Sequence, residues 1–255
     1  MMSLLFTACS PAASEDAAAP TPTTTSEALA TATLQPAATA TVSPSATPAP
    51  SAAPKTGQVV VLSPAEKISQ LVGDFDNERG EATRNRTGEH YQLPRTDLGV
   101  PFQHNGRTYI LFGDAWDPPD DPIATTTDTT PEDGLALEFL QNEDGTYHPL
   151  TIPGIRLDAF EVPTEGTSVD GKMYLYAATD HSGQTVMGRS VVAVSDDDGY
   201  TFTYLYDLSR QHFINVSIVE TDVSVMSGYP ASEGMGLVMF GSGAYRESNV
   251  HLAFQ

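Results

Sequence analysis

The chain has 255 residues, a single cysteine and a formal net charge of −21 at neutral pH. One cysteine excludes a disulfide within the chain. With 33 acidic against 12 basic residues, the chain lacks the clustered positive charge that phosphate binding requires, so we expect no nucleic-acid partner.

The first predicted element is a short apolar run, residues 4–8, which is followed directly by Cys9. An apolar run, a small residue, a cysteine and a long polar segment, in this order, resemble a bacterial lipoprotein signal. Residues 1–9 are therefore predicted to be such a signal, with a lipid on Cys9 that anchors the chain to the membrane at the cell surface. The alternative is an apolar N-terminus with a free thiol, because no basic residue precedes the run.

Residues 10–57 are predicted to be a disordered linker. Ala, Pro, Ser and Thr supply 39 of these 48 residues, and large apolar side chains are nearly absent. Such a segment buries too little surface to offset the entropy that is lost on ordering.

Residues 58–255 are predicted to form one monomeric domain of the all-β class. These 198 residues suffice for a substantial core. One short helical turn is expected at residues 64–72, and the rest reads as short β-rich runs separated by Gly, Asp, Asn and Pro. No stretch reaches the ~18–20 apolar residues that a membrane-spanning helix needs.

A hairpin around Asn105-Gly106 is the most informative local pattern. Asn-Gly between two apolar runs is the strongest short-range signal for a two-residue turn. Asp97 and Asp114 are equally distant from this turn, so an antiparallel pair without a bulge would place them opposite each other. Two carboxylates at one site are what glycoside hydrolysis needs, and a bulge at Gly99 would widen the pair. The alternative is that each aspartate caps a strand end or a turn.

An acidic and irregular segment follows the hairpin, at residues 117–134. Loops of this length are usually functional or disordered, and we interpret this one as a rim loop over the site. The prediction for the chain is no cofactor, with calcium bound in this segment as the alternative.

An internal repeat indicates the architecture. Residues 106–113 recur as 171–178 and as 234–241, at spacings of 65 and 63 residues. Each copy is a turn followed by a strand that is apolar on both faces, as an inner strand between neighbouring sheets should be. A period of this size without helices favours a β-propeller with four-stranded antiparallel blades, and two sandwiched sheets are the alternative. Three copies indicate about three blades, so we expect the domain to be incomplete at its C-terminus.

A second motif agrees with this architecture. Residues 195–202 read S-D-D-D-G-Y-T-F and fit the pattern S-x-D-x-G-x-T-F, the Asp-box of sialidase-like propellers. We expect Asp197 and Thr201 to satisfy backbone groups of a hairpin turn and Phe202 to pack into the blade. An EF-hand is excluded because the acidic residues lack its alternating spacing.

The string T-D-L-G-x-P-F…N-G-R-x-Y-x-L-F-G-D-x-W, which spans Thr96 to Trp116, resembles the bacterial domain-of-unknown-function family 4185. Residues 162–164, 195–202 and 240–249 resemble the later motifs of that family. The resemblance implies a five-bladed propeller, and because some members are endo-D-arabinanases it implies a surface glycoside hydrolase that acts on furanose polymers. It also implies that the paired aspartates of the family are Asp97 and Asp114.

Further polar and aromatic residues are candidate substrate contacts. They are Trp116, Glu165, Asp180, Arg95, Arg246 and Asn249. Trp116 is either a stacking platform for a sugar or a packing residue between blades. The two acids lie around the second repeat and contact a sugar or remain solvated, and each arginine contacts the substrate or pairs with a local carboxylate.

The sequence therefore predicts a lipid-anchored, surface-displayed propeller that hydrolyses an extracellular polysaccharide, with arabinan as the candidate substrate. Asp97 and Asp114 are the predicted acid and base or nucleophile. A non-catalytic carbohydrate-binding propeller is the alternative. A second alternative is an interaction module of the cell envelope, in which the two aspartates do not converge on one pocket.

Overall fold

The computed structural model describes residues 64–116, 119–158, 160–183, 186–243 and 249–255, which fall in one unit, Leu62–Gln255. The predicted lipoprotein signal with Cys9, the predicted linker and Arg246 lie outside the described residues.

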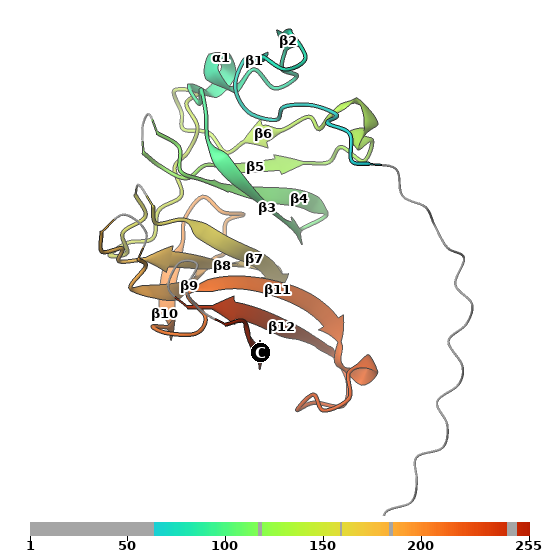
Figure 1. Ribbon diagram of the computed structural model, residues 1–255, viewed down its shortest axis with the longest axis vertical. Helices are drawn as coiled ribbons and strands as arrows, with labels where there is room; N and C mark the ends of the chain where they lie inside the picture. The colour runs from blue at the N-terminus through green and yellow to red at the C-terminus, as the bar shows by residue number, and fades with distance from the viewer. Residues whose placement is uncertain (1–63, 117–118, 159, 184–185, 244–248) are drawn as a thin grey trace, which may run out of the picture. The chain divides into compact units, whose positions relative to one another are not determined.

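Three antiparallel sheets build most of the described chain, and their first strands lie side by side (Figure 1). The first sheet contains β3 (Asp97–His104), β4 (Arg107–Gly113), β5 (Ile123–Thr126) and β6 (Glu138–Phe139). The second contains β7 (Pro163–Val169), β8 (Lys172–Thr179), β9 (Arg189–Ser195) and β10 (Thr203–Ser209). The third contains β11 (Asn215–Asp222), β12 (Met235–Ser242) and β13 (His251–Phe254). Strand β3 contacts β7, and β7 contacts β11, so the sheets radiate from their first strands as propeller blades do. The predicted fold class is confirmed.

The remaining elements are short. They are β1 (Phe75–Asp76), β2 (Glu81–Ala82), α1 (Thr87–Tyr91) and the 3₁₀ turns η1 (Pro131–Asp133) and η2 (Val223–Val225). No helix among the described residues is long and apolar enough to cross a membrane. The helical turn predicted at residues 64–72 is wrong, because this stretch has no regular structure and its Leu71 and Val72 pack on the outer side of the first sheet.

The three repeated segments are β4, β8 and β12, and each lies between two hydrogen-bonded strands. In β4, Leu111 faces the core shared with the second sheet, whereas Ile110 and Phe112 face the segment that carries Leu71 and Leu93. Both faces of β4 are therefore covered, which explains why its sequence shows no polar alternation.

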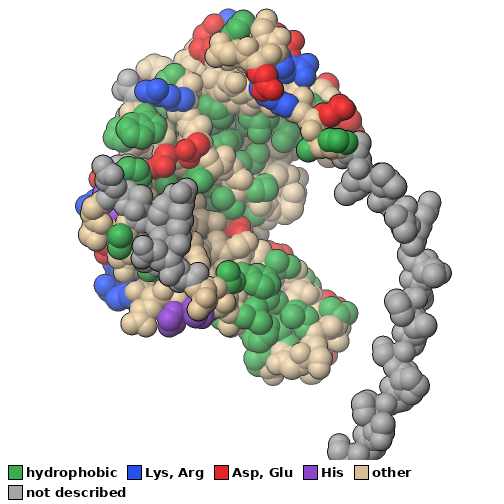
Figure 2. All heavy atoms as spheres, viewed as in Figure 1, with side chains coloured by type: hydrophobic (Ala, Val, Ile, Leu, Met, Phe, Trp, Pro, Cys, Tyr) green, Lys and Arg blue, Asp and Glu red, His purple; other side chains and the backbone are tan. Residues whose placement is uncertain are grey.

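The second and third sheets share a smaller core, which is made by Tyr176, Val192, Val216 and Met239. The other face of the third sheet exposes apolar side chains, and Figure 2 shows a hydrophobic surface in the region of this sheet. They are Val219, Phe240, Leu252 and Phe254, with exposed fractions between 39% and 56%.

The Asp-box joins β9 to β10 and has the predicted structural role. Asp197 accepts hydrogen bonds from the backbone N–H of Thr201 at 2.8 Å and from its hydroxyl at 2.7 Å. Phe202 is buried in the core between the first two sheets.

Candidate active site

Asp97 and Asp114 line the same cavity, of about 510 Å³, at the end of the blades where the first strands begin. Asp97 is the first residue of β3, and Asp114 directly follows β4. Apolar side chains of the neighbouring blades complete the lining, among them Phe160, Val162 and Met187. The two aspartates thus converge, as the hydrolase and the binding-module interpretations both require.

A bulge changes the predicted register of this pair. Val100 pairs with Leu111 as the two-residue turn requires, but Asp97 pairs with Gly113 and not with Asp114. Leu98 and Gly99 form the irregularity, and both have positive φ, at 60° and 145°. The expectation that Asp97 and Asp114 lie directly opposite each other is therefore wrong by one residue, and the alternative with a bulge at Gly99 holds.

The backbone around Gly113 explains how the bulge fits. A Cβ atom on Gly113 would lie 2.6 Å from Cδ1 of Leu98 and 2.8 Å from Cγ1 of Val162. Only glycine lets both side chains approach the strand so closely. The Thr96 hydroxyl also donates a hydrogen bond to the Gly113 carbonyl at 2.6 Å, so the end of β4 that precedes Asp114 is held from two sides.

Asp114 lies in surroundings that favour its protonated form. Burial raises the pKa of Asp114, and the charges of Asp97 and Glu161 raise it further. Its Oδ1 atom is buried without a hydrogen-bond partner. Asp97 is exposed along part of its side chain, and the pKa of Asp97 is raised by partial burial alone. The two carboxyls therefore differ in environment, which is the arrangement that separates an acid from a base.

Asp121 is a site residue that the sequence did not reveal. It is 3% exposed, and its Oδ1 accepts a hydrogen bond from the Asp114 backbone N–H at 3.0 Å. Burial raises the pKa of Asp121 to about 8, and that hydrogen bond only partly opposes the shift. Asp121 therefore holds the backbone of Asp114 while its own carboxyl stays mostly protonated at neutral pH.

Glu161 is the second unforeseen residue, and it is fully buried. Burial opposes its ionisation, but hydrogen bonds from the backbone and ring of His181 and from Arg156 outweigh burial and hold the pKa of Glu161 below its ordinary value. The Arg156 Nε and the His181 backbone N–H lie 2.7 and 2.9 Å from Glu161 Oε1. Glu161 thus supplies a fixed negative charge near Asp114, whereas its Oε2 atom has no hydrogen-bond partner.

One cluster of potential metal ligands lies beside these acids. Asp158, Glu161 and His181 offer ligand atoms that lie within 4.8 Å of one another. Arg156 already occupies Oε1 of Glu161 and balances its charge, so this cluster favours an ion-pair network over a cation. In the described part of the acidic segment, residues 119–134, no such group of ligands occurs. Only part of this segment is a loop, because it also contains strand β5 and the turn η1.

Two predicted substrate contacts lie outside the cavity. Glu165 is buried in β7, where it accepts hydrogen bonds from the backbone N–H groups of Gly166 at 3.1 Å and Ile218 at 3.0 Å. It therefore connects the second and third sheets. Asp180 follows β8 as Asp114 follows β4, and both have positive φ, but the Asp180 carboxylate accepts a hydrogen bond from Arg189 Nε at 2.7 Å. The structure does not bring either acid to Asp97 and Asp114.

The remaining predicted contacts are exposed or undescribed. Trp116 is 65% exposed, which excludes the packing role between blades. Arg95 and Asn249 are exposed and do not line the cavity. Arg246 lies outside the described residues. Their contact with a substrate stays a prediction.

An all-β propeller that carries an acid pair in a cavity at one end of its blades is the class of protein that this fold and this site define. The family model "Domain of unknown function (DUF4185)" matches residues 82–254, and the chain belongs to this family. No curated protein sequence matches the chain.

Several solved structures that resemble the chain are glycoside hydrolases. A GH43_1 enzyme from Xanthomonas citri is 16% identical, with 57% of this chain and 40% of that chain covered and a TM-score of 0.35. A GH43 β-xylosidase/α-arabinofuranosidase from a compost microbial metagenome is 16% identical, with 61% and 58% covered and a TM-score of 0.32. A GH43 endo-arabinanase from Bacillus licheniformis is 12% identical, with 66% and 76% covered and a TM-score of 0.26. The chain spans less than two thirds of the length of the first two.

Proposed function

We propose that this protein is a glycoside hydrolase that cleaves an extracellular polysaccharide. The observation that carries the proposal is the convergence of Asp97 and Asp114 on one cavity, with burial and two neighbouring charges raising the pKa of Asp114. Arabinan is the first substrate to test, because the resemblance in the first hairpin points to a family that includes endo-D-arabinanases. The lipid on Cys9, the cell-surface location and the monomeric state belong to the same proposal.

The two carboxyls have different roles in this mechanism. Asp114 donates its proton to the glycosidic oxygen as the bond from that oxygen to the anomeric carbon breaks. Asp97, as the carboxylate, either removes a proton from the attacking water or bonds to the anomeric carbon itself. The protonated Asp121 holds the Asp114 backbone, and the charge of Glu161 keeps the proton on Asp114 to a higher pH.

The test is reducing-sugar release from a panel of neutral polysaccharides that includes D-arabinan, xylan and galactan. We expect release by the unmodified protein and a loss of at least about a hundredfold in Asp97→Asn and in Asp114→Asn, since proton transfer contributes roughly 10²–10⁴-fold. Asp196→Asn is the matched control, because Asp196 is exposed and pairs with Lys172. Full release by either site variant would overturn the assignment. Retention of a glycan without any release would favour the binding module.

A further inference from the structure

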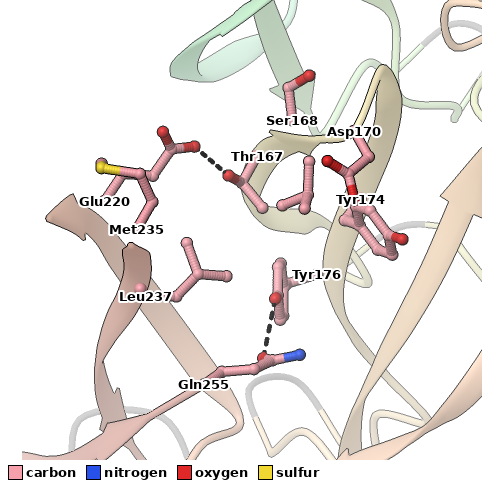
Figure 3. Close-up of a pocket in the computed structure, with 11 residues that line it drawn as sticks. Thr167, Ser168, Asp170, Tyr174, Tyr176, Glu220, Met235, Leu237 and Gln255 are labelled. Carbon is pink, nitrogen blue, oxygen red and sulfur yellow. Dashed lines mark hydrogen bonds between the residues drawn. The ribbon is translucent and has the colours of Figure 1, made fainter. Parts of the chain in front are cut away.

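A second cavity, of about 530 Å³, opens between the second and third sheets (Figure 3). Its lining comes from the end of β7, the turn after β7, part of β8, the facing ends of β11 and β12, and Gln255. The cavity of the acid pair is lined instead by the beginning of β7 and β11. The two cavities therefore lie at opposite ends of the same strands. We call the second one the inter-blade cleft.

Three hydrogen bonds hold the walls of the inter-blade cleft. The Thr167 hydroxyl on β7 donates to the Glu220 carboxylate on β11. The Tyr176 hydroxyl on β8 donates to Oε1 of Gln255 at 3.1 Å, and Nε2 of Gln255 donates to the Tyr206 hydroxyl at 3.0 Å. Both walls are thus fixed before any ligand arrives, and a preformed cavity of this volume is typical of small-molecule sites.

The side chains in the cleft combine an apolar wall with polar groups. Figure 3 shows Tyr174, Leu237 and Met235 around the cavity, with the carboxyls of Asp170 and Glu220 at its border. Tyr174 is half-buried and packs beside the core shared by the two sheets, so its ring is held in place. Among the described residues, the lining contains no Lys or Arg, which disfavours a phosphate or any other anion.

This combination matches one chemical class. A neutral sugar ring has an apolar face of C–H groups, which packs on an aromatic or aliphatic wall, and a rim of hydroxyls. Those hydroxyls donate to carboxylates and exchange hydrogen bonds with amide and phenol groups. Tyr174 with Leu237 supplies the wall, and Asp170, Glu220 and Gln255 supply the rim.

We propose that the inter-blade cleft is a carbohydrate-binding site for a neutral sugar unit, separate from the acid pair. It binds the glycan and takes no part in bond cleavage. A second site on the same domain raises the effective concentration of a polymer at the first, so the cleft would strengthen retention of long chains more than of short ones. Binding at the cleft does not depend on whether Asp97 and Asp114 hydrolyse the chain.

Affinity gel electrophoresis with the same neutral polysaccharides tests this site. Every variant carries Asp97→Asn, so the glycan is not consumed. Tyr174→Ala removes the ring, and Glu220→Gln removes the charge but keeps an oxygen for Thr167. Tyr204→Ala and Glu143→Gln are matched controls, because both residues are exposed and outside the cleft. We expect the two cleft variants to bind roughly three- to tenfold more weakly than the parent, and the controls to bind like the parent.

Two outcomes would overturn the site. They are equal retardation of the cleft variants and the parent, and no retardation of the parent by any polysaccharide. Because Glu220→Gln preserves the hydrogen bond to Thr167, its behaviour decides the matter even if Tyr174→Ala unfolds. Cleft-dependent retention without sugar release by the unmodified protein would keep this site and overturn the hydrolase.

Discussion

At the scale of the residue, the acid pair owes its character to two carboxyls that the sequence pattern does not mark. Asp121 is buried behind Asp114, and Glu161 is buried beside it with Arg156 and His181. One is held protonated by burial and the other is held ionised by its donors. Asp114 lies next to both, so its protonated form is stabilised by these surroundings and not by any property that distinguishes one aspartate from another in the sequence.

Asp121→Asn tests the buried proton through stability. A folded-state pKa of about 8, above the ordinary value of 3.8, means that the folded protein binds more protons than the unfolded chain between those values. The stabilisation from this proton is therefore complete below pH 3.8 and is lost progressively as pH rises to about 8. We expect Asp121→Asn to melt roughly 4–8 °C higher than the parent at pH 9 and to differ little at pH 4.

Differential scanning calorimetry across this pH range measures the difference, and Glu132→Gln, at an exposed residue of the same segment, is the control. A pH-independent difference between the Asp121 variant and the parent would contradict the buried, protonated carboxyl.

Glu161→Gln tests the fixed charge through the pH profile of kcat/KM. The negative charge of Glu161 raises the pKa of Asp114, so its removal should lower that pKa and move the alkaline limb of the profile to lower pH. Asp158→Asn, an exposed member of the same cluster, should leave the limb in place. An unchanged limb in Glu161→Gln would show that the charge does not reach Asp114.

The sequence was sufficient to predict the pair but not its surroundings. Asp97 and Asp114 are equidistant from a recognisable turn, so local turn chemistry brings both ends of the hairpin to one site, although the bulge shifts their register by one residue. Glu161 reaches Asp114 only because two blades pack, and no spacing rule covers that contact. Asp121 lies in an acidic stretch whose sequence resembles a solvated loop. Its burial results from the packing of the sheet, which the local sequence does not indicate.

At the scale of the element, the bulge in β3 and the glycine in β4 position the acids. Gly113 is the residue that Asp97 pairs with, and Leu98 and Val162 close over it. The predicted register failed at this point because Leu98 and Gly99 adopt positive φ, which adds a residue to one strand. The repeat of β4, β8 and β12 was visible in the sequence, because strands inside a sheet keep their apolar pattern wherever both neighbours are present.

Gly113→Ala tests this element. The added methyl group would meet Leu98 and Val162 below 3.0 Å, so we expect a loss of about 1–3 kcal/mol in the free energy of unfolding. Because Asp114 is the next residue, the folded protein should also lose roughly ten- to hundredfold in kcat.

Gly166→Ala, in β7, is the matched control, since its methyl group would meet Phe102 of β3 at 2.6 Å. Neither residue lines the cavity of the acid pair. This variant should lose similar stability in urea unfolding and keep its kcat. Equal losses of kcat in both variants would contradict a specific role of the Gly113 turn.

At the scale of the whole molecule, the described blades leave the outer face of the third sheet uncovered. Val219, Phe240, Leu252 and Phe254 form an apolar surface there, whereas the corresponding faces of the first and second sheets meet a neighbouring sheet. An exposed apolar surface of this kind is a binding surface for apolar molecules such as a hydrophobic dye.

Leu252→Lys tests this surface. A charge at a residue that is already 56% exposed costs little stability, so we expect an unchanged melting temperature. We also expect the fluorescence of a bound apolar dye to fall by at least about half. Ile68→Lys is the control, because Ile68 is 47% exposed elsewhere. Equal dye binding by both variants would mean that the third sheet is covered in solution.

In the proposed mechanism, Asp114 donates the proton and Asp97 acts on the other side of the sugar. The most direct measurement is kcat/KM on two substrates, arabinan and a dinitrophenyl arabinofuranoside whose leaving group needs no proton. We predict that Asp114→Asn loses activity on arabinan but keeps most of it on the aryl glycoside, whereas Asp97→Asn loses both. An Asp114→Asn variant that loses both activities equally, or keeps both, would contradict the account.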